Sequence, residues 1–127
     1  MGGFVGNIEE KTLNNSFFRQ VLFTGPHSQL VVMSLQPNED IGLEVHQSVD
    51  QFFRIEQGEG KVVINGEEQA IKDGFAIVIP AGTEHNVVNT SADKQLKLYT
   101  IYTPPQHKDA IIHKTKEEAM ADTTDHL

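Results

Sequence analysis

The sequence predicts an all-β protein, and two features carry that prediction. The chain is divided into short segments rich in β-branched and aromatic residues, and each segment is closed by Gly, Pro, Asn or Asp. One pair of segments, in the run VVINGEEQAI, is separated by Asn65-Gly66, the strongest short-range signal for a two-residue hairpin. About nine short strands at close, regular spacing are typical of a β-sandwich or a β-barrel.

The expected strands follow one another along most of the chain. They cover residues 17–24, 28–35, 42–46, 51–57, 61–64, 68–71, 75–80, 85–90 and 96–102. Before them, residues 1–16 are polar and contain Gly and Asn, and we expect a loose entry segment. After them, TPPQHKD predicts a rigid spacer. Thr115 with Glu118 forms a capping box, which predicts a short helix over 116–121.

Length and composition indicate one globular domain over residues 1–127, with the barrel in about 17–103 and a tail in 104–127. Hydrophobic residues make up 38% and charged residues 22%, as in ordinary soluble proteins. No apolar run approaches the roughly 18 residues that span a bilayer. The start, MGGFVGNIEE, lacks the basic and apolar regions of a secretory signal. We therefore expect a cytoplasmic protein with no membrane partner.

Charge and cysteine content exclude several kinds of site. The formal net charge is −8 and no basic patch is present, which argues against nucleic acid as a partner. The chain has no cysteine, so it contains neither disulfides nor thiolate metal sites.

The stretch GLEVHQSVDQFF places Glu44 and His46 two residues apart, and such residues point to one face of a strand. If that face is the interior, both side chains need a partner there, because an unpaired buried charge is costly. The candidates are each other, another protein group or a metal ion.

The next strand enters the core with an amide, Gln51. Charged residues alternate along this segment and mark the outer face, which leaves Gln51 inside with Phe53 and Ile55; the outer set is Asp50, Phe52, Arg54 and Glu56. An outward Phe52 is either a dimer contact or an isolated surface aromatic.

A second constellation lies in GFAIVIPAGTEHNVVN. Pro80 and Gly82 form a tight turn, and His85 opens the strand behind it. On its own, a histidine at a strand start is more often satisfied or solvent-exposed than functional.

Together the two stretches resemble the cupin family over about residues 28–103. The second cupin motif, G-x5-P-x-G-x2-H-x3-N, is matched at every fixed position, by Gly74, Pro80, Gly82, His85 and Asn89. The first motif, G-x5-H-x-H-x3,4-E-x6-G, is matched in part. His46 and Gly58 stand at the second His and the closing Gly, whereas the positions of the opening Gly, the first His and the Glu are held by Asn38, Glu44 and Gln51.

The resemblance implies a jelly-roll barrel that binds a divalent metal through the motif side chains. The ligands would be Glu44, His46, Gln51 and His85, which offer two imidazoles, one carboxylate and one amide oxygen. Such a set suits Fe, Mn, Co, Ni or Zn, and the affinity order of these metals does not choose among them. The alternative is a metal-free cupin in which Glu44 pairs with His46 or His85.

Other candidate residues are assigned structural roles. We expect Asn89 and Gly82 to be turn residues. The remaining histidines fall in loops or in the tail and are expected to be solvated; these are His27, His107, His113 and His126.

The resemblance implies two kinds of function. The first is a metal-dependent enzyme acting on a small polar molecule inside the barrel, because the Gln- and Glu-containing ligand set resembles that of cupin mannose-6-phosphate isomerases, where the metal polarises a sugar carbonyl. Dioxygenation is the other frequent chemistry of small cupins. Tyr99, Tyr102 or His107 would be the side chains that approach the site.

The second kind of function is a non-catalytic module that binds or senses a small molecule. No DNA-binding helices accompany the barrel, which argues against a transcription factor. Small cupins commonly pair through the outer face of one sheet, and Phe52 with the apolar segment 17–23 fits a homodimer.

Overall fold

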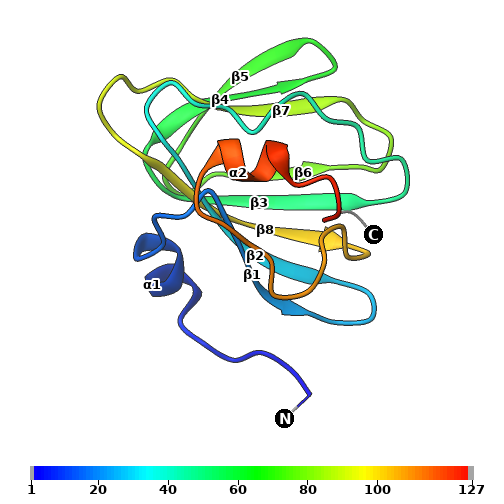
Figure 1. The fold of residues 1–127 in the computed structure, drawn as a ribbon. Coiled ribbons are helices and arrows are strands. Elements are labelled where there is room, and N and C mark those ends of the chain that lie inside the picture. The colour runs from blue at the N-terminus through cyan, green and yellow to red at the C-terminus, as the bar shows by residue number, and fades with distance from the viewer. Residues whose placement is uncertain (1, 126–127) are drawn as a thin grey trace.

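Two antiparallel sheets form the body of the protein in the computed structural model, which describes residues 2–125 (Figure 1). The larger sheet has six strands in the order β6-β3-β8-β2-β1-β9: Ala76–Ile79, Asp50–Gln57, Leu96–Thr103, Gln29–Leu35, Arg19–Thr24 and Ile112–His113. The smaller sheet has three, in the order β5-β4-β7: Glu67–Lys72, Glu59–Ile64 and His85–Asn89. The expected all-β class and jelly-roll barrel are confirmed.

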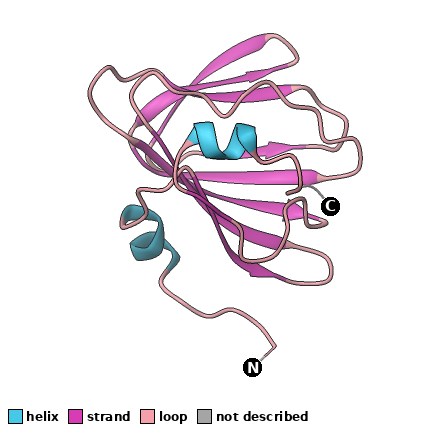
Figure 2. Ribbon diagram, in the orientation of Figure 1, coloured by secondary structure: helices cyan, strands magenta, loops and turns pink. Residues whose placement is uncertain are grey.

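Two short helices flank the sheets (Figure 2). The predicted C-terminal helix is confirmed as α2, Lys116–Ala121, and the Thr115 side chain accepts a hydrogen bond from the Glu118 N–H as the capping box requires. The expectation of a loose segment over residues 1–16 is wrong in part. Helix α1 spans Ile8–Leu13, because the Asn7 side chain caps its first turn. Neither helix, nor any other among residues 2–125, is long and apolar enough to cross a membrane.

The strand expected at 42–46 does not form. Glu44 and His85 exchange two backbone hydrogen bonds of 2.9 Å, and the contact is an isolated bridge rather than a ladder. Gly42, with φ of 114°, turns the chain just before it. The segment nevertheless lies against β7, which is what brings Glu44 to the barrel interior.

The core fills the space between the two sheets. Along β3 the expected alternation is confirmed, since Gln51, Phe53 and Ile55 are only 2%, 1% and 0% exposed. Phe53 and Ile55 join a single cluster with residues of the other strands, among them Val31, Leu35, Val62, Val87 and Leu98. One half of the barrel interior is therefore hydrophobic, and the interior becomes polar at Gln51.

Strands β4 and β7 of the smaller sheet lie close together at Gly60. A Cβ added to Gly60 would stand 2.2 Å from the Val88 carbonyl oxygen, so no larger residue fits there without moving the backbone. The hairpin between β4 and β5 turns at Asn65-Gly66 as predicted, and both residues have positive φ, 49° and 82°.

The C-terminal tail, residues 104–125, covers one side of the barrel. Its strand β9 pairs with β1, Arg19 lying opposite His113. Lys116 at the start of α2 forms an ion pair with Asp40, which in turn bridges to Val88 of the smaller sheet. The tail thus reaches from the edge of one sheet to the other.

Candidate metal centre

Three parts of the fold supply the predicted ligands. Gln51 is the second residue of β3, and His85 is the first residue of β7. Glu44 and His46 come from the segment between β2 and β3, where Leu43 and Val45 point outward with 63% and 40% exposure. This confirms the interpretation that Glu44 and His46 share one face.

Backbone contacts hold the two motif stretches together. The bridge between Glu44 and His85 sets these two residues side by side. The N–H of Gly82 donates to the carbonyl oxygen of His46 over 2.8 Å, which ties the turn before β7 to the segment that carries His46. The positions of the ligand side chains are therefore set by main-chain hydrogen bonds, although the side chains are far apart in the sequence.

The structure brings all four predicted side chains together. One ligand atom from each of Glu44, His46 and His85 lies within 4.8 Å of those of the other two, and among residues 2–125 this is the one such group of three or more His, Asp or Glu. Gln51 joins them, since its Oε1 lies 3.2 Å from Nε2 of His85. We call these four residues the ligand cluster.

The hydrogen bonds around the ligand cluster leave lone pairs facing one another. Nδ1 of His85 lies 2.9 Å from the Thr83 carbonyl oxygen, which can only accept, so the proton is on Nδ1 and Nε2 carries a lone pair. The Gln51 amide donates its N–H to Thr100 Oγ1, which directs its oxygen at that lone pair. Two acceptors 3.2 Å apart repel each other, so this contact needs either a second proton on the His85 imidazole or a cation between the two atoms.

A second pair of ligand atoms, from Glu44 and His46, also lies in close contact. Oε2 of Glu44 lies 2.7 Å from Nε2 of His46, but this nitrogen is buried and the approach is too bent for a hydrogen bond. Ligands bound about 2.1 Å from one ion lie about 3.0 to 3.4 Å apart when adjacent. The donor chemistry of the ligand cluster therefore fits a divalent transition metal, the His85–Gln51 contact has the spacing of adjacent ligands, and Nε2 of His46 has no hydrogen bond.

Charge around Glu44 favours its ionised form. Burial by itself raises the pKa of the carboxyl, but the neighbouring His46 and the positive charge of Arg19 favour the ionised form, and the pKa is lowered overall. Glu44 is the one anionic side chain of the ligand cluster. With a divalent ion bound, the ion and its ligands together would carry one net positive charge, because Glu44 neutralises only one of the two.

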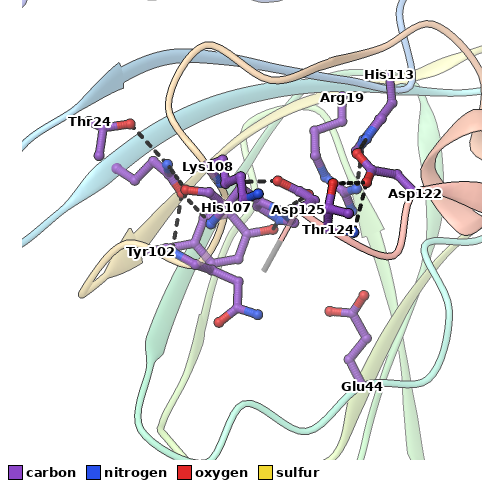
Figure 3. A network of polar contacts seen from close by, with 12 residues as sticks. Arg19, Thr24, Glu44, Tyr102, His107, Lys108, His113, Asp122, Thr124 and Asp125 are labelled. Atoms are coloured by element: carbon purple, nitrogen blue, oxygen red, sulfur yellow. Dashed lines mark hydrogen bonds and ion pairs between the residues drawn. The ribbon is translucent and has the colours of Figure 1, made fainter. Parts of the chain in front are cut away.

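Beside the ligand cluster lies a buried chain of hydrogen bonds that we call the tail network (Figure 3). His107 Nδ1 lies 2.5 Å from Asp125 Oδ2, and His107 Nε2 lies 3.2 Å from the Tyr102 hydroxyl. The ring of Tyr102 is 6.0 Å from that of His46. Burial raises the pKa of Tyr102, with contributions from Glu44 and Asp125, so its hydroxyl stays protonated at neutral pH.

Several sequence expectations about polar residues are wrong. His107 and His113 are not solvated but 3% and 4% exposed. His113 lies between Arg19 and Asp122, with its two ring nitrogens 3.2 Å and 3.0 Å from them. His27 is exposed as expected. His126 lies outside the described residues.

Asn89 is not a turn residue either. It ends β7 and is 1% exposed. Its amide donates to the carbonyl oxygens of Leu35, Gln36 and Lys94, and its Oδ1 accepts from the N–H of Ser91. Asn89 therefore closes the end of the barrel opposite the ligand cluster.

The sequence analysis missed two residues near the ligand cluster, Arg19 and Asp125. No motif contains them, and both are brought inward by tertiary contacts. A surface hollow of about 860 Å³ lies away from the ligand cluster, between the end of β3 and the start of β8; Gln57, Lys72, Asp73 and Gln95 are among the residues that line it.

Comparisons with known proteins agree with this geometry. The family model described as the cupin domain matches residues 31–102. The chain is 49% identical over 124 residues to the uncharacterized protein YrkC of Bacillus subtilis, covering 93% of this chain and 66% of that protein. It is 47% identical over 108 residues to the uncharacterized protein L612 of Acanthamoeba polyphaga mimivirus, covering 82% and 67%. The chain thus spans about two thirds of the length of these relatives.

Solved structures show the same fold. The crystal structure of BH2720 from Bacillus halodurans superposes with a TM-score of 0.91 at 49% identity, over 94% of each chain. That of TT1209 from Thermus thermophilus gives 0.69 at 24% identity, over 79% of this chain and 96% of that one, a likeness of fold alone. With the jelly roll, the two motif stretches and these relatives in agreement, the chain belongs to the cupin family.

Proposed function

We propose that this cupin holds a divalent transition metal through Glu44, His46, Gln51 and His85, and that it is a metal-dependent enzyme acting on a small polar molecule. The observation that carries the proposal is the convergence of Glu44, His46 and His85, whose ligand atoms lie within 4.8 Å of one another, with Gln51 Oε1 3.2 Å from His85 Nε2. When bound, such a metal supplies a Lewis acid that polarises a carbonyl or hydroxyl group. Fe, Mn, Co, Ni and Zn all suit two imidazoles with one carboxylate.

The tail network supplies what the ligand cluster lacks, a group that moves a proton. The short contact with Asp125 places the His107 proton on Nδ1, so Nε2 accepts from the Tyr102 hydroxyl. Burial and the charge of Arg19 lower the pKa of His107 to about 4, which keeps the imidazole neutral. A proton leaving the substrate would move to the Tyr102 oxygen as the tyrosine proton moves to His107, and Asp125 would stabilise the imidazolium.

This arrangement supports proton-transfer chemistry, as in a sugar isomerase like the mannose-6-phosphate isomerases, over dioxygenation. Exchange of carbon-bound hydrogen in D2O, followed by NMR for a panel of small aldoses, ketoses and 2-oxo acids, tests the first. Oxygen consumption tests the second. The variant Tyr102→Phe is expected to slow exchange by about a hundredfold, the usual contribution of a positioned acid–base group.

Metal analysis is the primary test. Protein purified without a nickel column is analysed by plasma mass spectrometry, together with Glu44→Ala and His85→Ala and with His27→Ala as an exposed control. We expect near-stoichiometric metal in the wild type and the control, and its loss in the two cluster variants. Folded wild-type protein that takes up no metal would contradict the proposal. Metal without turnover on the panel would favour a non-catalytic small-molecule binding module.

A further inference from the structure

Arg19 is a buried cation without a carboxylate partner. It is 7% exposed, and no Asp or Glu among residues 2–125 comes within ion-pair distance of it. Its Nε is buried and makes no hydrogen bond, and its guanidinium carbon lies over the Phe18 ring, 5.2 Å from the ring centroid. A guanidinium buried in this way is costly unless something anionic completes its surroundings.

The second arginine of the chain has a carboxylate beside it, although its buried Nε, like that of Arg19, makes no hydrogen bond. Arg54 lies on the outer face of β3, and its side chain is 42% exposed. Even so, its Nε lies 3.1 Å from Oε1 of Glu56. The exposed arginine thus has a carboxylate, and the buried one has none.

One edge of the Arg19 guanidinium has no hydrogen-bond partner among residues 2–125. Its single hydrogen bond to a described residue runs from Nη1 to Nδ1 of His113, 3.2 Å away. Because a guanidinium only donates, Nδ1 must accept, and His113 then donates from Nε2 to Asp122 over 3.0 Å. His113 and Asp122 therefore orient Arg19, while the edge formed by Nε and Nη2 makes no hydrogen bond to residues 2–125.

Arg19 faces the same interior as the ligand cluster. Figure 3 shows its side chain reaching from β1 toward the carboxylate of Glu44. The charge of Arg19 acts on the pKa of Glu44, of Tyr102 and of His107, which lie around that interior. The side chain of Glu44 is 29% exposed, so solvent contacts the ligand cluster at this residue.

We propose that the free edge of Arg19 binds the carboxylate of a small organic acid whose carbonyl or hydroxyl oxygen faces the ligand cluster. A carboxylate accepts two parallel hydrogen bonds from such an edge and carries the single charge that one guanidinium neutralises. A phosphate brings more charge than the one available edge matches. This inference refines the proposed function by naming the substrate class, and it favours an organic acid over a sugar phosphate.

The test observes Arg19 directly. In ¹⁵N-labelled protein loaded with Zn²⁺, the two arginines give two Nε–H signals, assigned with Arg19→Lys and Arg54→Gln. Glycolate is titrated at constant ionic strength, with its neutral analogue glycolamide and with inorganic phosphate in parallel. The same titrations are repeated on protein stripped of metal, and Kd is measured for Arg19→Gln with Arg54→Gln as the matched control.

We expect glycolate, but not glycolamide, to shift the Arg19 signal saturably and to leave the Arg54 signal in place. Loss of the charge-assisted pair in Arg19→Gln should weaken glycolate binding roughly tenfold or more, with no change in Arg54→Gln. If Arg19→Gln does not fold, the wild-type titration still decides. A saturable shift in metal-free protein would support the Arg19 site even where the metal proposal fails.

Three outcomes would overturn the inference. Glycolate binding that leaves the Arg19 signal and the Arg19→Gln affinity unchanged would mean that the metal alone holds the acid, and the proposed function would stand without the Arg19 site. A stronger response to phosphate than to glycolate would reject the carboxylate. Absence of glycolate binding in both metal-loaded and stripped protein would reject the site altogether.

Discussion

Gln51 provides an amide oxygen where the cupin motif has a carboxylate, and Glu44 provides a carboxylate where the motif has an imidazole. The exchange keeps one negative charge in the ligand cluster but moves it from β3 to the segment before it. Glu44 is also the more exposed of the two, since Gln51 is 2% exposed. A neutral amide is the weaker ligand, so in the proposed metal site Glu44 and the two histidines would contribute most of the affinity.

Replacing Gln51 by Glu should strengthen metal binding and weaken the metal-free fold. A second carboxylate improves the ligand set, and we expect metal affinity to rise about tenfold or more. Without metal, two carboxylates share one buried site, which should cost about 1 to 3 kcal/mol of unfolding free energy. Competition with a chelator measures the first effect, and thermal unfolding with and without EDTA measures the second.

Gln47→Glu is the matched control, because Gln47 is exposed and outside the ligand cluster. It should change neither quantity. Unchanged metal affinity in Gln51→Glu would show that residue 51 does not contact the metal.

Among the elements, the C-terminal tail contributes most to the polar half of the barrel. It adds β9 to the larger sheet, places His113 beside Arg19, and buries Asp125 against His107. Helix α2 itself buries none of its residues and is tethered by the ion pair of Lys116 with Asp40. The tail is therefore held by buried polar contacts more than by the packing of its helix.

Those contacts make the stability of the protein depend on pH. The pKa of His107 is lowered to about 4 in the fold, against an ordinary value of 6.5. The unfolded chain then binds the proton first, so the contribution of neutral His107 is complete above pH 6.5 and is lost as pH falls toward 4. We expect unfolding free energy to drop by about 2 to 3 kcal/mol over that window from this residue.

Urea unfolding at a series of pH values measures the effect. His107→Gln should flatten the pH dependence between pH 6.5 and 4, whereas the exposed-site control His27→Gln should leave it as in the wild type. A wild-type profile that is already flat there would contradict the assignment.

At the scale of the whole molecule, the outer face of the larger sheet carries apolar side chains. Phe52 lies opposite Val78 in the β3–β6 register, and its ring is 6.2 Å from that of Tyr99. Val78 is 66% exposed. Such a face fits the homodimer expected from the sequence, with the two larger sheets pairing through it.

Sedimentation analysis tests the dimer. The wild type is expected at twice 14.1 kDa, and Val78→Lys at 14.1 kDa with unchanged circular dichroism. Val5→Lys, at a position that is 83% exposed, is the control and should remain dimeric. A monomeric wild type at micromolar concentration would show that the homodimer prediction is wrong.

Features that depend on neighbouring residues could be predicted from the sequence. The alternation along β3 identified Gln51 as inward, the Asn65-Gly66 pair identified the hairpin, and Thr115 identified the start of α2. The helix α1 was missed, because six residues capped by one asparagine give a weak local signal. At 42–46 the alternation was correct although no strand forms, since the side-chain direction needs only an extended backbone.

By itself, the sequence determined the all-β class and the two motif stretches, because each rests on a short-range pattern or spacing, and the resemblance of those stretches to the cupin motifs implied the four ligands. Only the tertiary structure decided that Arg19 is buried beside them and that His107 meets Asp125. The segment around Arg19 is apolar at both odd and even positions, so its alternation selects no face. The partner of Arg19, His113, is 94 residues away, and such a contact exists only once β9 has paired with β1.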